Sequence, residues 1–133
     1  MVLRVDPGVP RGGGASVTSA FVENRGGIDV FEEGVAWEIR TGEDPNGTEP
    51  DAVVTLNPAY LRDELWFDPA PAERTAPIPA GRLDAVGFFA HEFGHVIGFN
   101  GWGNTATGAF PGNYRSRFDR LSRWDGTNWF FDG

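Results

Sequence analysis

Glycine and proline break this chain into short pieces and leave one stretch that is long and periodic enough for a regular helix. Nineteen glycines and ten prolines lie among its 133 residues. Glycine and proline interrupt helices and strands, so we expect short elements joined by turns. The length suits a single domain, because chains usually divide into several domains only above roughly 250 residues. We therefore expect an α+β fold in which one helix packs on a small twisted sheet.

The exceptional stretch covers residues 84–97. Asp84 lies where an N-cap belongs, and apolar residues then recur at positions 86, 89, 90, 93, 96 and 97, close to the helical period. Gly98 is placed to end the helix.

The other predicted elements are short. We expect residues 1–14 to be a flexible N-terminal segment, because residues 7–14 are almost all glycine and proline, and residues 15–133 to form the domain. The remaining expectations are a helix at 15–22, two strands within 28–41, a strand at 51–56, an extended piece at 64–67, a non-helical crossing at 69–79, a helical or irregular piece at 114–123 and an aromatic hairpin around 124–129.

Composition excludes several classes of function. The formal charge of −8 argues against non-specific nucleic-acid binding, which needs a basic surface. All eleven bases are arginine, which excludes Schiff-base lysines and the P-loop lysine. Cysteine is absent, so thiol nucleophiles and cysteine zinc sites are excluded. No apolar run approaches the ~18 residues that a membrane-spanning helix needs, and we expect no membrane insertion.

Both histidines of the chain lie in the predicted helix, within His91-Glu92-Phe93-Gly94-His95. Four helical residues turn through about 400°, so the two imidazoles point the same way, within reach of one ion. Glu92 lies beside that face, where a carboxylate can take a proton from a water activated by zinc. This spacing would arise by chance in about one chain in a thousand, which makes it specific. We predict that His91 and His95 bind Zn²⁺ and that Glu92 is the catalytic base.

The rest of the helix fits the same interpretation. Gly94 and Gly98 each follow a histidine by three positions and leave room beside the ligands. We expect the opposite face of the helix to be core, through Val86, Phe89, Phe93, Val96 and Ile97. The alternative is a structural helix whose histidines pack or cap, but three internal glycines would make such a helix poor.

A catalytic zinc takes a third protein ligand, and the sequence offers none that is clear. There is no glutamate after Glu92 and no third histidine. Among the downstream oxygen donors, Asp119 is the best candidate, although pairing with a neighbouring arginine is the favoured interpretation of that residue. Residues 44–51 carry Asp44, Asn46, Glu49 and Asp51, for which an acidic turn is favoured over a calcium site.

The run His-Glu-x-Gly-His-x-x-Gly-Phe, with the Asn-Gly-Trp that follows it, resembles the zincin metalloproteases. It is similar in particular to secreted bacterial metzincin-like proteases related to the leishmanolysin group. The resemblance implies a third histidine further along the chain and a methionine turn beneath the metal. This chain has no third histidine, and its only methionine is Met1. We therefore expect it to be the N-terminal portion of such a domain.

Two hypotheses follow. The first is a secreted zinc-dependent metalloendopeptidase that acts on protein or peptide substrates. The second is a non-catalytic, acidic, secreted metal-binding or adhesion module, or an inactive protease fragment. The sequence predicts neither the cleavage specificity nor the oligomeric state.

Overall fold

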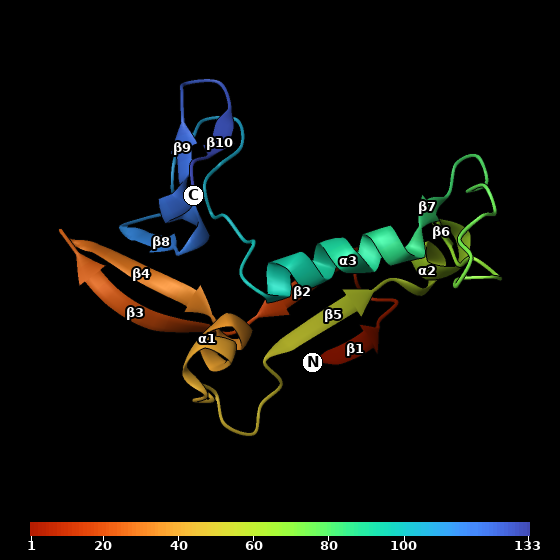
Figure 1. Ribbon diagram of the computed structural model, residues 1–133, viewed down its shortest axis with the longest axis horizontal. Helices are drawn as coiled ribbons and strands as arrows, with labels where there is room; N and C mark the ends of the chain where they lie inside the picture. The colour runs from red at the N-terminus through yellow and green to blue at the C-terminus, as the bar shows by residue number, and fades with distance from the viewer.

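The computed structural model describes residues 1–133 and has the expected α+β composition, with three α-helices and several small sheets (Figure 1). One body consists of a three-stranded sheet with the long helix α3 (Ala85–Val96) lying along it. A second three-stranded sheet and a hairpin form a lobe at the other end of the molecule. None of the helices has the length and apolar character required to cross a membrane.

The sheet under α3 is built around β5 (Ala52–Leu56), the strand that the sequence predicts most clearly. It pairs in parallel with β1 (Val2–Val5) and antiparallel with β2 (Gly13–Val17). Its side chains alternate, so that Ala52, Val54 and Leu56 are buried. A Cβ on Gly13 would lie 2.3 Å from Leu56 and 2.7 Å from Phe88 of α3, so glycine at this position lets the helix approach the sheet closely.

The second sheet has the order β3-β4-β8, with β3 (Ser19–Arg25), β4 (Ile28–Glu33) and β8 (Tyr114–Ser116). β3 and β4 are antiparallel, whereas β4 and β8 are parallel. Val30 is buried in β4, and so are the two acids that end it, Glu32 and Glu33. This sheet therefore brings carboxylates into the interior near the end of α3.

The remaining elements are short. They are α1 (Gly34–Thr41), α2 (Pro58–Asp63), β6 (Leu65–Trp66), β7 (Leu83–Asp84), the 3₁₀ helix η1 (Phe118–Leu121), β9 (Ser122–Trp124) and β10 (Trp129–Phe131). β9 and β10 pair antiparallel, which confirms the predicted aromatic hairpin. No helix lies between residues 69 and 79, as its four prolines require.

Three of the predicted elements differ in the structure. Residues 1–14, expected to be a flexible segment, contain β1 and the first residues of β2, because both can pair with the strongly β-forming β5. The helix predicted at 15–22 is instead strand, shared between β2 and β3. The second strand expected before residue 41 is α1, because the chain turns at Gly34, whose N–H donates to the Thr18 carbonyl at 2.7 Å.

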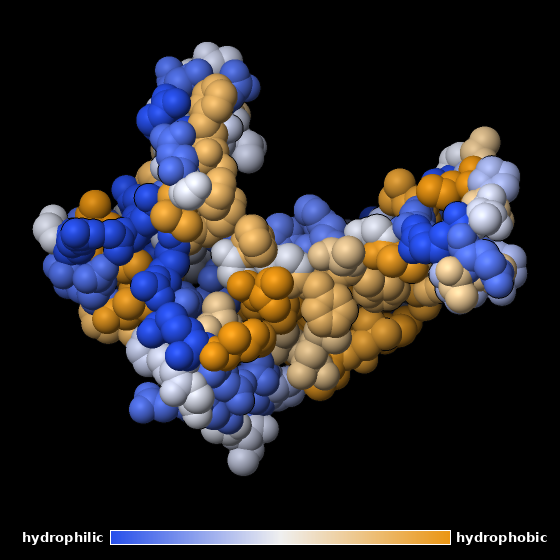
Figure 2. All heavy atoms as spheres, in the orientation of Figure 1, coloured by the Kyte–Doolittle hydropathy of each residue, from blue (hydrophilic) through white to orange (hydrophobic).

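Hydrophobic residues gather on the surface over α3 and the sheet below it, whereas the β3-β4-β8 lobe is mainly hydrophilic on the same side (Figure 2). Only seven hydrophobic residues are fully buried, four of them in β4 and β5. The core is therefore small and centred on β5.

Candidate metal centre

Helix α3 places both histidines, and local interactions define its ends. The Asp84 side chain accepts the Gly87 N–H at 2.9 Å, which confirms the predicted N-cap. The helix ends at Val96, and Gly98 follows with φ of +108°, a conformation that favours glycine. His91 and His95 therefore lie within one continuous helix, one turn apart, as predicted.

The two imidazoles converge. The Nε2 atoms of His91 and His95 are 3.0 Å apart, and the rings lie at 83° to each other with centroids 4.5 Å apart. Two nitrogens that each lie about 2.0–2.1 Å from one tetrahedral ion are about 3.3 Å apart. The observed separation is that of a hydrogen bond between the two rings and is close to that value, so a small opening of the rings would accommodate a cation between them.

A backbone carbonyl orients one of these rings. His95 Nδ1 lies 2.8 Å from the carbonyl oxygen of Phe99. A carbonyl only accepts hydrogen bonds, so the proton is on Nδ1, and in the neutral ring the Nε2 lone pair faces His91. Metal-ligating histidines characteristically donate their second N–H in this way. Nothing in the sequence predicts this contact, because it depends on how the chain leaves the helix after Gly98.

Glu92 lies against a cavity that His91 shares. The cavity, of about 450 Å³, extends beside the first half of α3, and its lining includes Asp84, Phe88, His91 and Glu92. Glu92 is buried, with 5% of its surface exposed, whereas His91 is exposed. The structure therefore brings the predicted base and one predicted ligand to the same space.

Tyr60 of α2 adds a hydroxyl on this side of the helix. Its ring packs on Phe88, with centroids 5.6 Å apart. Burial raises the pKa of Tyr60, and the negative charges of Glu64 and Glu92 raise it further. The phenol therefore keeps its proton at neutral pH and can donate a hydrogen bond.

The prediction about the opposite face of α3 was wrong. Val86, Phe93 and Ile97 are exposed, and of the five expected core residues only Val96 is fully buried. The helix instead rests on the sheet through the side that carries Ala85, Phe88 and Glu92. The reason is geometric: the apolar residues extend over more than half of the helix circumference, and the single sheet covers only one side.

No further histidine, cysteine, aspartate or glutamate lies close enough to His91 and His95 to form a group of three that could hold a metal ion. Asp119 is engaged elsewhere and is 6% exposed. Its carboxylate accepts the Trp102 N–H at 3.0 Å and the Ser116 N–H at 2.9 Å, so it ties the loop after α3 to β8. The expected pairing with an arginine is also wrong, because Arg117 and Arg120 bind Glu32 and Glu23 instead.

Asp119→Asn tests this structural role. We expect the free energy of unfolding to fall by about 1–3 kcal/mol, because an amide NH₂ would face backbone N–H donors that now have an acceptor. Urea denaturation measures this change, with the exposed Asp132→Asn as the matched control. The metal content should be unchanged, and a loss of metal from a variant that remains folded would show that Asp119 is a ligand.

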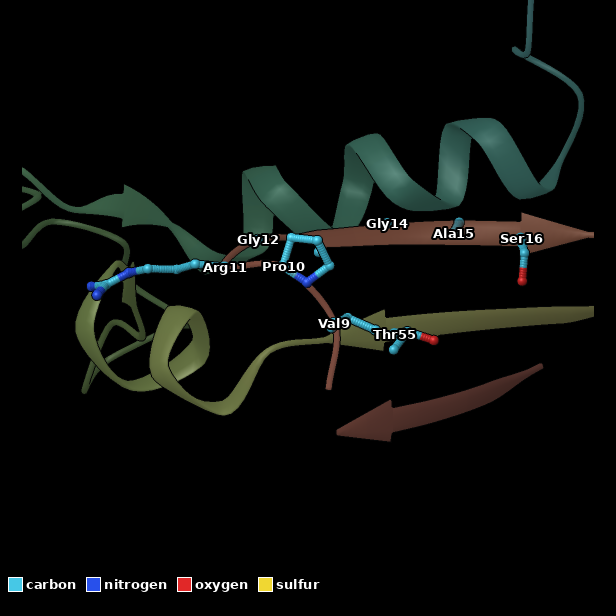
Figure 3. A pocket seen from close by; sticks show the side chains of 9 residues that line it. Val9, Pro10, Arg11, Gly12, Gly14, Ala15, Ser16 and Thr55 are labelled. Atoms are coloured by element: carbon cyan, nitrogen blue, oxygen red, sulfur yellow. The ribbon is translucent and has the colours of Figure 1, made fainter. Parts of the chain in front are cut away.

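Two other regions carry either clustered acidic residues or a cavity. In the acidic loop, Asp44 accepts the N–H groups of Asn46 and Gly47 at 2.9 and 2.8 Å, as expected for an acidic turn. A cavity of about 460 Å³ lies beside β2 and β5 (Figure 3). Its only ionisable side chain is Arg11, which pairs with Glu64.

Comparisons with protein-family models, curated proteins and solved structures found no match to this chain. The functional assignment therefore depends on the geometry of the site.

Proposed function

We propose that this protein is a zinc-dependent metallopeptidase with a zincin-like arrangement, in which His91 and His95 bind the metal and Glu92 is the general base. The observation that carries the proposal is the convergence of the two Nε2 atoms, 3.0 Å apart, with the His95 ring oriented by the Phe99 carbonyl. This contact supports the proposal, because it turns the Nε2 lone pair of His95 toward His91.

The chemistry divides between the metal and the chain. A bound zinc ion polarises a peptide carbonyl and lowers the pKa of water toward neutrality. Glu92, which lines the cavity beside His91, would take the proton of the attacking water and pass it to the leaving amine. Tyr60, held neutral nearby, would donate to the oxygen on which negative charge develops.

The cavity beside α3 supports a peptide as the substrate. It is bounded on one side by β7, a two-residue strand that pairs only with β6. A strand with a free edge can pair with an extended peptide through backbone hydrogen bonds. A substrate bound in that way would pass His91 and Glu92.

Metal titration and a hydrolysis assay test the proposal together. We expect one zinc ion per chain, cleavage of an unfolded protein substrate, and loss of that cleavage on chelation with recovery on addition of zinc. His91→Ala and His95→Ala should each bind less than about a tenth of the metal at equal free zinc. Stoichiometric zinc without cleavage would favour the metal-binding module. The absence of zinc would refute both the peptidase and the metal-binding module.

A further inference from the structure

A cavity also lies between the β3-β4-β8 sheet and the β9-β10 hairpin, in the lobe at the other end of the molecule (Figure 1). Its volume is about 300 Å³, at the lower end of the range for pockets that bind small molecules. Three arginines and three aromatic residues form most of its wall, namely Arg25, Arg115, Arg120, Phe110, Trp124 and Trp129. The cavity therefore combines positive charge with aromatic rings in a chain whose formal charge is −8.

The register of the sheet places two of these arginines on one face. Ile28 of β4 pairs with Arg25 of β3, and Val30 of β4 pairs with Arg115 of β8. Paired residues point to the same face of a sheet, and so do residues two apart along a strand. Val30 is buried, so the face that it shares with the two arginines is a covered one. The sheet thus directs both arginines to the side on which the cavity lies, and both line it.

Neither of these two arginines has a carboxylate partner. Seven of the eleven arginines form ion pairs, and Arg25 and Arg115 are among the four that do not. Since acids outnumber bases by 19 to 11 in this chain, two unpaired arginines at one cavity are an exception. Arg120 differs, because it pairs with Glu23 at 2.7 Å. The unbalanced positive charge of the cavity therefore belongs to Arg25 and Arg115.

Asp119 is the one acid in the lining, and backbone donors already bind it. Its carboxylate accepts the N–H groups of Trp102 and Ser116, and the residue is 6% exposed. This negative charge repels any anion that enters the cavity, and it repels a dianion more strongly than a monoanion. The cavity therefore favours a ligand with a single negative charge.

Arg115 is held in place by contacts that leave part of its guanidinium group free. Its Nη1 donates to the carbonyl oxygens of Gly112 and Tyr114, both at 2.8 Å. Its Cζ lies 3.5 Å from the centroid of the Phe110 ring, as in a cation–π contact. A guanidinium group has five N–H donors, and the two hydrogen bonds involve Nη1 alone. The edge formed by Nε and Nη2 matches the two oxygens of a carboxylate.

The hairpin brings two indole rings to the same cavity. Trp124 and Trp129 are opposite each other in β9 and β10, with ring centroids 5.6 Å apart. Trp129 Nε1 donates to the Asn104 carbonyl at 3.2 Å, which orients that ring. A Cβ on Gly108 would lie 2.3 Å from the Trp124 ring, so glycine lets this indole pack against the loop. Aromatic rings held in this way favour a ligand that is itself flat and aromatic.

We propose that this cavity binds a small aromatic carboxylate, with the carboxylate on Arg25 and Arg115 and the ring against Trp124 and Trp129. A carboxylate is a planar monoanion, and the guanidinium fork binds it through two parallel hydrogen bonds. Such a ligand is either a free aromatic acid or an aromatic residue at the C-terminus of a peptide. The inference does not rest on the proposed peptidase activity, because no residue of the histidine pair lines this cavity.

Calorimetric titration of the full chain tests the proposal. The probes are benzoate, its uncharged isostere benzamide, the non-aromatic cyclohexanecarboxylate and the dianion phenyl phosphate. We expect benzoate to bind, benzamide to bind about 10- to 100-fold more weakly, and cyclohexanecarboxylate to bind about 2- to 10-fold more weakly. N-acetylphenylalanine separates the two sources of the ligand. Tighter binding than benzoate assigns the site to peptide C-termini, and weaker binding assigns it to free aromatic acids.

Three glutamine variants locate the bound ligand. Arg115→Gln should weaken benzoate binding by about 10- to 100-fold, and Arg25→Gln, at an exposed residue, by about 2- to 5-fold. Arg4→Gln is the matched control, because Arg4 is an exposed arginine of β1 without an ion pair and should not affect binding. Circular dichroism checks the fold of each variant. Arg25→Gln removes no ion pair, so it should stay folded and carries the test if Arg115→Gln does not fold.

Several results would overturn the proposal. The first is an absence of binding of both benzoate and N-acetylphenylalanine. Equal binding of benzoate and benzamide would show that the charge has no role, and tighter binding of phenyl phosphate than of benzoate would assign the cavity to another class of anion. Unchanged benzoate binding in the folded Arg25→Gln and Arg115→Gln variants would place the ligand elsewhere. Loss of benzoate binding in His91→Ala would place it at the candidate metal centre.

Discussion

Substitution of Glu92 by glutamine is expected to lower the hydrolysis of an unfolded protein substrate by about 10²- to 10⁴-fold, while zinc remains bound. Glutamine keeps the size of the side chain but cannot take a proton. Glu92 is 5% exposed and lines the same cavity as His91, so the isosteric change should leave both the helix and the two ligands in place. Initial rates and the zinc content of the same preparation measure the two effects.

Glu38→Gln is the matched control. Glu38 is an exposed glutamate in α1 and forms no ion pair, so its substitution should leave the rate unchanged within about twofold. If Glu92→Gln retained full activity, the role of Glu92 as the base would be refuted. If the variant lost zinc together with activity, Glu92 would be needed for zinc binding, and the loss of activity would not support its role as the base.

The second large effect is expected in the core. Leu56→Ala should lower the free energy of unfolding by about 2–5 kcal/mol, because Leu56 is 0% exposed at the end of the central strand β5. Its side chain lies over Gly13 and beside Phe88, where α3 approaches the sheet. Domains have a total stability of about 5–15 kcal/mol, so this single change removes a large share.

Urea denaturation measures this loss, and Leu3→Ala is the control with the same chemistry. Leu3 lies in β1 of the same sheet but is 55% exposed, so its truncation should cost no more than about 0.5–1 kcal/mol. The zinc affinity of Leu56→Ala should fall when the fold begins to unfold, because the helix that carries both histidines rests on this sheet. Equal effects of the two substitutions would contradict the assignment of β5 as the centre of the core.

The parts of the site that follow from local geometry could be predicted from the sequence. The N-cap at Asp84 and the convergence of His91 and His95 both depend on residues within one helical turn. The strand at β5 was equally clear, because a compact β-branched run ends at Asn57-Pro58. These features need no knowledge of distant residues.

The wrong secondary-structure predictions concern segments whose conformation depends on the strands with which they can pair. Residues 15–22 have an ambiguous apolar spacing, and they form strands because β5 and β4 offer edges to pair with. Val35, Trp37 and Ile39 alternate as in a strand, but the chain turns at Gly34 and satisfies its hydrogen bonds within α1. Local propensity is a weak guide where a neighbouring strand decides the outcome.

By itself, the sequence determined that one helix presents two imidazoles on one side, because the α-helical repeat alone dictates that arrangement. Only the tertiary structure decided which side of α3 faces the sheet, that Asp119 binds backbone amides, and that Glu33 is buried. The reason is physical: periodicity shows that a face is apolar, but burial requires a partner surface, and that surface comes from residues far away in the chain.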